Sequence, residues 1–169
     1  MADRAAPAPV PKPGDPGEAD LGILLTTAMR GFVDLLHAEL VKRGYGEVRP
    51  AFGVVFRALR DGPLTLTELA ARLGVTKQAA AKVVDEMDAK GLLRRRADPS
   101  DARAKLLELT ARGRGAMRTA IAIGADLEAR LREHTSDAAV VGTKATLAAF
   151  VDQAGGTREL ADRRSRALW

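Results

Sequence analysis

Residues 65–110 constrain the fold more strongly than any other part of the sequence. Two short helical patterns meet at Gly74, and a basic segment with turn chemistry at its centre follows them directly. Thr65 and Glu68 have the spacing of a capping box, which begins a helix. Gly74 supplies the backbone freedom that a sharp turn between two helices needs. This order predicts a helix-turn-helix followed by a hairpin.

The second of these helices is predicted to have a buried face and an outward face. Four apolar residues recur at helical spacing and form the expected core stripe: Ala80, Val83, Val84 and Met87. Five residues at or near the start of the helix are the candidates for contact with duplex DNA: Thr76, Lys77, Gln78, Ala81 and Lys82. Gln78 can bond bidentately to adenine, and the small Ala81 allows close approach to a thymine methyl group.

Charge along this helix runs against the local rules. Lys77 lies in the first turn, whereas Asp85, Glu86 and Asp88 lie toward the end. The helix dipole favours the opposite order by roughly 0.3–1 kcal/mol for each charge. Because local rules tend to be broken where function requires it, we interpret the basic end as entering a major groove while the acidic end points away from the phosphates. The alternative is a solvated surface helix with an arbitrary charge order.

The basic segment 94–105 is the sharper signal. It holds five cations and two acids, a net charge of +3, around the turn sequence Asp-Pro-Ser-Asp. Arg103 at the predicted tip is expected to enter a minor groove, held by a charge-assisted bond from one of the two acids. The candidate DNA-contacting residues of this hairpin are Arg94, Arg95, Arg96, Asp98, Asp101, Arg103 and Lys105. The alternative is a charged, solvated edge that prevents strand aggregation.

Helical patterns also flank this central unit. The sequence predicts helices from Leu21 to about Arg43, from Arg49 to Leu59 with Pro50 near its first turn, from Thr110 to about His134, and a last helix ended by Gly155-Gly156. On the third of these, one apolar stripe is expected: Met117, Ala120, Ile121, Gly124, Leu127 and Leu131. The end helices carry more apolar surface than one small unit can bury, so a second copy of the chain is expected to cover the excess.

The same residues resemble the MarR (multiple antibiotic resistance regulator) family of winged-helix regulators. The resemblance is carried by Leu69-Ala70, Leu73-Gly74-Val75-Thr76-Lys77-Gln78, Val84, Gly91-Leu92-Leu93, Arg95-Arg96, Asp98-Pro99, Asp101-x-Arg103-Ala104 and Leu109-Thr110-x-x-Gly113. Including the flanking helices, it extends over about residues 21–153. Ala79-Ala80-Ala81 stands where members often have hydroxyl side chains, so an operator preference does not carry over.

The resemblance implies a mainly helical fold with a minor α+β part, in which a winged helix-turn-helix lies between N- and C-terminal dimerisation helices. The corresponding regions are a disordered Pro/Ala-rich extension (1–19), a dimerisation helix with a support helix (20–60), the winged helix-turn-helix (61–112), the C-terminal dimerisation helices (113–154) and a basic tail (155–169). It also implies a homodimer on a pseudo-palindromic operator, with recognition helices in successive major grooves about 34 Å apart.

Many members of the family that the chain resembles release DNA when a small aromatic acid binds near the dimer helices. The candidate ligand-binding residues here are Arg30, His37, Tyr45, Phe52 and Phe56, with Arg30 or Arg94 as the partner of a carboxylate. The alternative is that the aromatic residues are ordinary core. The expected function is a sequence-specific repressor relieved by such an acid, and the alternative is a nonspecific architectural protein of duplex DNA.

Composition argues against several other classes. Cysteine is absent, and the two histidines, His37 and His134, lack metal-ligand spacing, so neither a metal nor a cofactor is expected. The three serines lie in no nucleophile motif, so an enzyme is not expected. No aromatic residue lies between Phe56 and Phe150, which leaves the basic unit without a stacking platform for single strands. A net charge of +5 suits duplex DNA.

The chain is expected to be cytoplasmic. Its first twenty residues lack the apolar segment of a secretion signal. No uninterrupted apolar run approaches the roughly 20 residues that cross a bilayer, so no membrane association is expected.

Overall fold

The computed structural model describes residues 19–99 and 104–156. The N-terminal extension, Asp101, Arg103 and most of the basic tail lie outside the described residues. Contacts divide the chain into two compact units, one up to Leu35 and one from Leu36 onward. Helix α1 contributes residues to both units.

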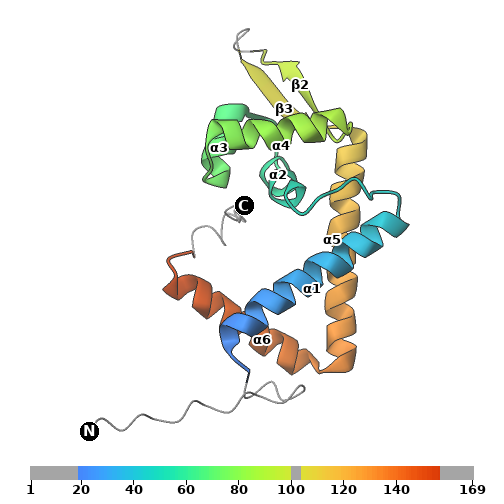
Figure 1. The fold of residues 1–169 in the computed structure, drawn as a ribbon, viewed down its shortest axis with the longest axis vertical. Coiled ribbons are helices and arrows are strands. Elements are labelled where there is room, and N and C mark those ends of the chain that lie inside the picture. The colour runs from blue at the N-terminus through green and yellow to red at the C-terminus, as the bar shows by residue number, and fades with distance from the viewer. Residues whose placement is uncertain (1–18, 100–103, 157–169) are drawn as a thin grey trace, which may run out of the picture. The chain divides into compact units, whose positions relative to one another are not determined.

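Helices dominate the described residues, with a small antiparallel sheet, as the sequence predicts (Figure 1). In chain order the elements are α1 (Leu21–Lys42), α2 (Phe52–Ala58), β1 (Leu64–Thr65), α3 (Leu66–Leu73), α4 (Lys77–Ala89), β2 (Leu93–Ala97), β3 (Lys105–Leu109), α5 (Ala111–His134) and α6 (Asp137–Gln153).

The sheet has a strand that the sequence did not predict. Its order is β1-β3-β2, with both pairs antiparallel. In β1, Leu64 pairs with Leu107 and Thr65 pairs with Leu106. Two residues carry no strand periodicity of their own, so this strand exists only because β3 lies beside it. The pairing fixes the entry to α3 against the hairpin.

The second helix is shorter than predicted. It begins at Phe52 rather than at Arg49. The amide of Phe52 donates to the carbonyl of Arg49 at 2.9 Å, and that of Gly53 donates to Pro50 at 3.1 Å. These bonds span three residues, so the segment from Arg49 forms a tighter turn that leads into α2.

The core of the second unit lies between α2, α3, α4, the sheet and α5 as far as Leu127. Its largest fully buried side chains are Phe52, Val55, Leu69, Val84, Met87, Leu92, Leu93, Leu107 and Ile123. The predicted stripe of α5 is partly wrong: Ile121 and Leu131 are 58% and 56% exposed, whereas Ile123, outside that stripe, is 1% exposed. A helix with apolar residues on several faces does not reveal from its sequence which face its neighbour covers.

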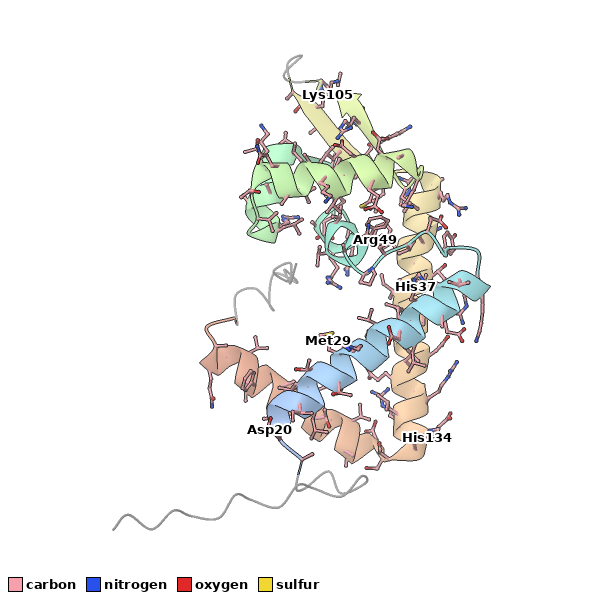
Figure 2. The ribbon with its side chains drawn as sticks, viewed as in Figure 1. Asp20, Met29, His37, Arg49, Lys105 and His134 are labelled. Atoms are coloured by element: carbon pink, nitrogen blue, oxygen red, sulfur yellow. The ribbon has the colours of Figure 1, made fainter. Side chains whose placement is uncertain are left out.

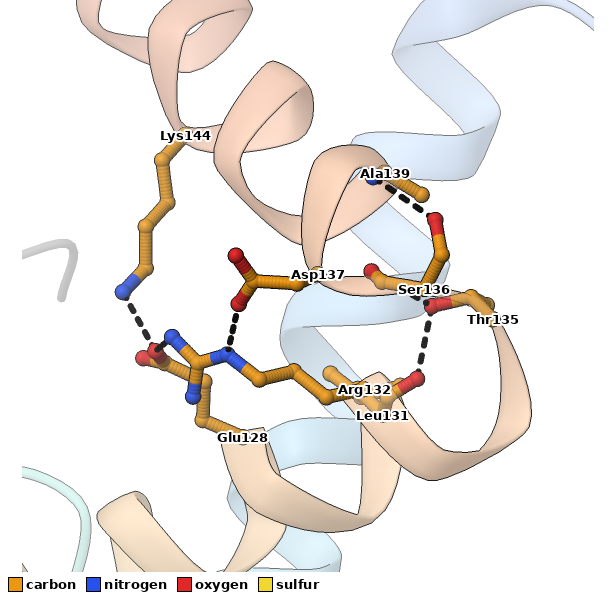
Figure 3. A network of polar contacts seen from close by, with 8 residues as sticks. All are labelled: Glu128, Leu131, Arg132, Thr135, Ser136, Asp137, Ala139 and Lys144. Carbon is orange, nitrogen blue, oxygen red and sulfur yellow. Dashed lines mark hydrogen bonds and ion pairs between the residues drawn. The ribbon is translucent and has the colours of Figure 1, made fainter.

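The corner between α5 and α6 is closed by a polar network (Figure 3). Ser136 caps α6 by accepting a hydrogen bond from the amide of Ala139 at 3.1 Å. Arg132 of α5 donates to Asp137 at 2.9 Å and also to Glu128, which Lys144 of α6 reaches at 2.5 Å. The hydrogen bond from Lys144 is the main cause that lowers the pKa of Glu128 below its ordinary value.

The expectation about membrane-crossing segments needs a correction. By length and composition alone, α1 is long and apolar enough to cross a membrane, with a mean hydropathy of 1.3 over its most apolar window. Helix α1 has no uninterrupted apolar run of that length, but its most apolar window meets the criterion when up to two charged residues are allowed. One such helix is weak evidence for a membrane segment, because core helices of soluble proteins and signal sequences near an N-terminus pass the same test.

Candidate nucleic-acid interface

The turn between α3 and α4 has the geometry that the sequence predicts. Thr65 and Glu68 form a reciprocal capping box, in which the Thr65 hydroxyl accepts from the Glu68 amide at 3.2 Å and the Glu68 carboxylate accepts from the Thr65 amide at 2.7 Å. The hydrogen bond from the Thr65 amide lowers the pKa of Glu68. Gly74 ends α3 in the left-handed conformation at φ 66°, and Thr76 caps α4 through the amide of Ala79.

Helix α4 presents its basic end to solvent. The core stripe is confirmed, since Ala80, Val83, Val84 and Met87 are buried. The predicted contact residues lie on the other side: Thr76, Lys77, Gln78 and Lys82 are exposed and Ala81 is half-buried. Within the described residues, neither lysine forms a salt bridge, so both ammonium groups are available to a polyanion.

Strands β2 and β3 form the predicted hairpin, and its arginines are ion-paired. Glu108 of β3 lies opposite Arg94 in the register and receives hydrogen bonds from Arg94 at 2.5 Å and from Arg96 at 3.1 Å. The bond from Arg94 is the main cause that lowers the pKa of Glu108. The carboxylate therefore stays ionised and holds two of the candidate cations against the hairpin.

Arg95 points to a different partner. Its guanidinium reaches Asp85 at 2.5 Å and Asp88 at 3.2 Å, so it links β2 to the acidic end of α4. Glu86 of the same helix accepts two bonds of 2.8 Å from Arg49, which lies just before α2. The charge order along α4 led us to expect these acids to lie away from the DNA, but the sequence did not predict their arginine partners. The acids at the unfavourable end of the helix were the signal that such partners exist.

The far end of the hairpin carries the remaining predicted contacts. The amide of Asp98 donates to the carbonyl of Ala104 at 3.1 Å, which extends the ladder by one bond. Lys105 is exposed and labelled at the distal end of the hairpin in Figure 2. Asp101 and Arg103 lie outside the described residues, so the predicted minor-groove contact remains a prediction.

The candidate ligand residues have different local surroundings. Phe52 and Phe56 are 0% and 3% exposed and belong to the core, which is the alternative that the sequence left open. His37 donates to the carbonyl of Val48 at 3.1 Å, and Tyr45 packs under the guanidinium of Arg112 at 5.4 Å. Arg30 is exposed on α1.

A cavity of about 230 Å³ lies elsewhere in the second unit. Its lining residues come from the end of α2 with the loop that follows, the end of β3 and the start of α5: Leu59, Arg60, Asp61, Gly62, Pro63, Glu108, Leu109, Arg114 and Met117. None of the candidate ligand residues lines it. Across residues 19–99 and 104–156, no group of three or more metal-ligating side chains comes together.

Helices α3 and α4 are both capped, a left-handed glycine joins them, and the basic hairpin of β2 and β3 follows. This arrangement defines a winged helix-turn-helix, a fold that binds duplex DNA. The family model described as MarR family matches residues 53–104, from α2 to the residue before β3. No curated protein sequence matches the chain.

Solved structures extend the likeness beyond the winged helix. RV1404 from Mycobacterium tuberculosis is 28% identical, with a TM-score of 0.63 over 80% of this chain and 94% of that one. The M. tuberculosis MarR family protein RV2887, solved with salicylic acid, is 29% identical, with a TM-score of 0.55 over 77% and 95%. YusO from Bacillus subtilis, at 24% identity, shares the fold with a TM-score of 0.62 over 85% and 99%.

The chain therefore carries a winged helix-turn-helix that matches the MarR family model over residues 53–104, and it shares its fold with solved proteins that include MarR-family members. Members of this family are DNA-binding regulators rather than enzymes.

Proposed function

We propose that this chain is a homodimeric transcriptional repressor that binds a pseudo-palindromic duplex operator and releases it when a small aromatic acid binds. The observation that carries the proposal is the exposed basic end of α4. Lys77, Gln78 and Lys82 project from a helix whose opposite face is locked in the core. Cations that contact phosphate beside an amide that reads bases give both affinity and sequence preference.

The hairpin supplies a second contact in this proposal. Arg94, Arg96, Asp98 and Lys105 belong to the hairpin whose strand β2 packs against α4, and a wing in this place reaches the neighbouring groove or backbone. Glu108 holds both arginines, so on binding they exchange part of a carboxylate interaction for phosphate. Lys105 is exposed and forms no salt bridge with a described residue, which favours it as the first contact of the hairpin.

The homodimer is supported by apolar surface that one chain leaves uncovered. Among the described residues, twelve large hydrophobic side chains are at least 39% exposed: Leu21, Ile23, Leu24, Met29, Phe32, Leu35, Val41, Ile121, Leu131, Val141, Leu147 and Phe150. All of them belong to α1, α5 or α6. Soluble monomers rarely leave so many apolar side chains on three helices in contact with water. Family regulators bind DNA as dimers.

Ligand relief is proposed from the relative that was solved with salicylic acid. Arg30, His37 and Tyr45 remain the candidate contacts, whereas Phe52 and Phe56 belong to the buried core. A ligand releases DNA only if it binds the DNA-incompatible state more tightly than the competent one. Repression follows in the proposal because an occupied operator excludes other proteins. A cytoplasmic location is part of the same proposal.

Selection of bound duplexes from a random pool, repeated with a set of aromatic acids, tests this function. We expect enrichment of a palindrome, and release of the enriched duplex by at least one acid. Enrichment without release would remove the ligand from the proposal. Retention of all duplexes alike would favour a nonspecific architectural protein instead.

A further inference from the structure

Three acidic residues in the C-terminal half of α4 are each held by an arginine from another element. Asp85 and Asp88 bind Arg95 of β2, and Glu86 binds Arg49 of the segment before α2. Acids at this end are unfavourable for the helix itself because of its dipole. Their role is therefore tertiary: they attach the recognition helix to its neighbours.

Arg95 is held at two points. Its Nη2 lies 2.5 Å from Asp85 Oδ1, and its Nη1 lies 3.2 Å from Asp88 Oδ2. The two carboxylates are three residues apart, so they stand on the same face of α4. A planar guanidinium held at both ends fixes an orientation that a single contact does not fix. Residues alternate along a strand, so Arg94 and Arg96 face Glu108 while Arg95 faces α4.

A role for Arg95 as a phosphate contact conflicts with this geometry. Its side chain is 32% exposed, whereas that of Arg94 is 64% exposed. If Arg95 turned to a phosphate, Asp85 and Asp88 would lose the only counter-charge that the described residues give them and would repel each other. Like charges at close range repel most when no counter-charge is present. The paired arrangement avoids this cost while the hairpin remains beside the helix.

We propose that Arg95 is a positioning residue that ties the wing to the recognition helix through Asp85 and Asp88, so that both engage the duplex as one preordered unit. The inference rests on the proposed function, because it assigns a role within duplex binding. Exposed ion pairs add little to folding stability. A pair that orders two binding elements before contact acts on affinity instead, because less freedom is lost on binding.

The test compares three variants on the full chain, with duplex affinity measured by fluorescence anisotropy at several salt concentrations. Arg95→Gln and Asp85→Asn/Asp88→Asn are both expected to weaken binding by roughly tenfold. The combination of all three substitutions is expected to be no weaker than either alone, since both remove the same link. Removal of two negative charges from a DNA-binding protein would otherwise leave duplex affinity unchanged or raise it, so a loss of affinity supports the link.

Arg95→Lys separates charge from geometry. Lysine keeps the cation but lacks the planar fork that spans two carboxylates. We expect weaker binding with an unchanged salt slope. Glu86→Gln is the matched control, since it removes one acid of α4 whose partner lies outside the wing. We expect this control to bind at least as tightly as the parent chain.

The inference is overturned if Arg95→Gln lowers the salt slope by about one while the aspartate variant binds more tightly, which is the pattern of a phosphate contact. Equal losses for Glu86→Gln would also overturn it. Hydrogen exchange of residues 93–109 without DNA gives a separate readout, expected to quicken in both link-breaking variants at unchanged melting temperature. Failure of the parent chain to bind any duplex would contradict the proposed function. Unchanged hydrogen exchange in the Arg95 and aspartate variants would contradict the link between the wing and the recognition helix.

Discussion

Gly113 lies so close to Leu92 that a Cβ on the glycine would stand 1.9 Å from the carbonyl oxygen of the leucine. The same carbonyl accepts a hydrogen bond from the amide of Thr110 at 3.1 Å. The Thr110 hydroxyl caps α5 through the Gly113 amide and donates to Gly91 at 2.6 Å. These contacts bring three segments together: the end of β3, the start of α5 and the residues that follow α4.

Gly113→Ala is expected to destabilise the fold by about 1–3 kcal/mol, since backbone rather than a flexible side chain blocks the new methyl group. Thermal or denaturant unfolding measures the change. Gly53→Ala is the matched control: it lies in α2 with open space at its Cβ position and should be neutral or slightly stabilising. Equal stability of Gly113→Ala and the parent chain would contradict the close packing of Gly113 against the Leu92 carbonyl.

Acid is expected to destabilise the winged helix through Glu68 and Glu108. The pKa of each lies below its ordinary value of 4.5, because Thr65 and Arg94 respectively donate hydrogen bonds to the ionised form. The unfolded chain therefore binds more protons below about pH 4.5. The stabilisation is complete above that pH and is lost as the pH falls through the depressed values.

Denaturant unfolding from neutral pH down to about pH 3 measures this dependence. Glu68→Gln combined with Glu108→Gln should flatten the acid limb. An acid limb of undiminished slope in this double variant would assign the loss to other carboxylates, such as Glu39 and Glu128, whose pKa values are lowered by lysine hydrogen bonds.

Lys82→Ala is expected to weaken binding to every duplex and to reduce the salt slope by about one, because one phosphate contact is lost. Lys90→Ala is the matched control, since Lys90 caps the opposite end of the same helix. Titrations at several salt concentrations distinguish the two. An unchanged slope for Lys82→Ala would remove Lys82 from the phosphate contacts.

Phe150→Asp is expected to weaken self-association by at least about tenfold, because a charge replaces an apolar side chain that a second copy would bury. Phe150 is 52% exposed in the single chain. Light scattering over a concentration series measures the change, with exposed Gln153→Glu as the control. A parent chain that stays monomeric at micromolar concentration would itself contradict the homodimer.

Local chemistry made the helix-turn-helix predictable. The capping box at Thr65, the left-handed Gly74 and the Thr76 cap each depend on residues within a few positions, so sequence spacing is sufficient. The core stripe of α4 has a regular period for the same reason. These elements are found where the sequence predicts them.

Features that depend on distant partners were not predictable in this way. The pairing of β1 requires β3, which lies more than forty residues further along the chain. The choice of Ile123 over Ile121 as the buried residue depends on which face of α5 the core covers. The partners of Arg95 and Arg49 are brought together only by the packing of β2 and the loop before α2 around α4.

Hydroxyl-radical footprinting of the full chain on a duplex enriched by selection tests the central claim most directly. We predict two protected regions related by a two-fold axis, with their centres one helical turn, about 34 Å, apart. The complex should contain two chains for each duplex. A single protected region, or uniform protection of unrelated duplexes at the same concentration, would contradict a homodimeric, sequence-specific regulator.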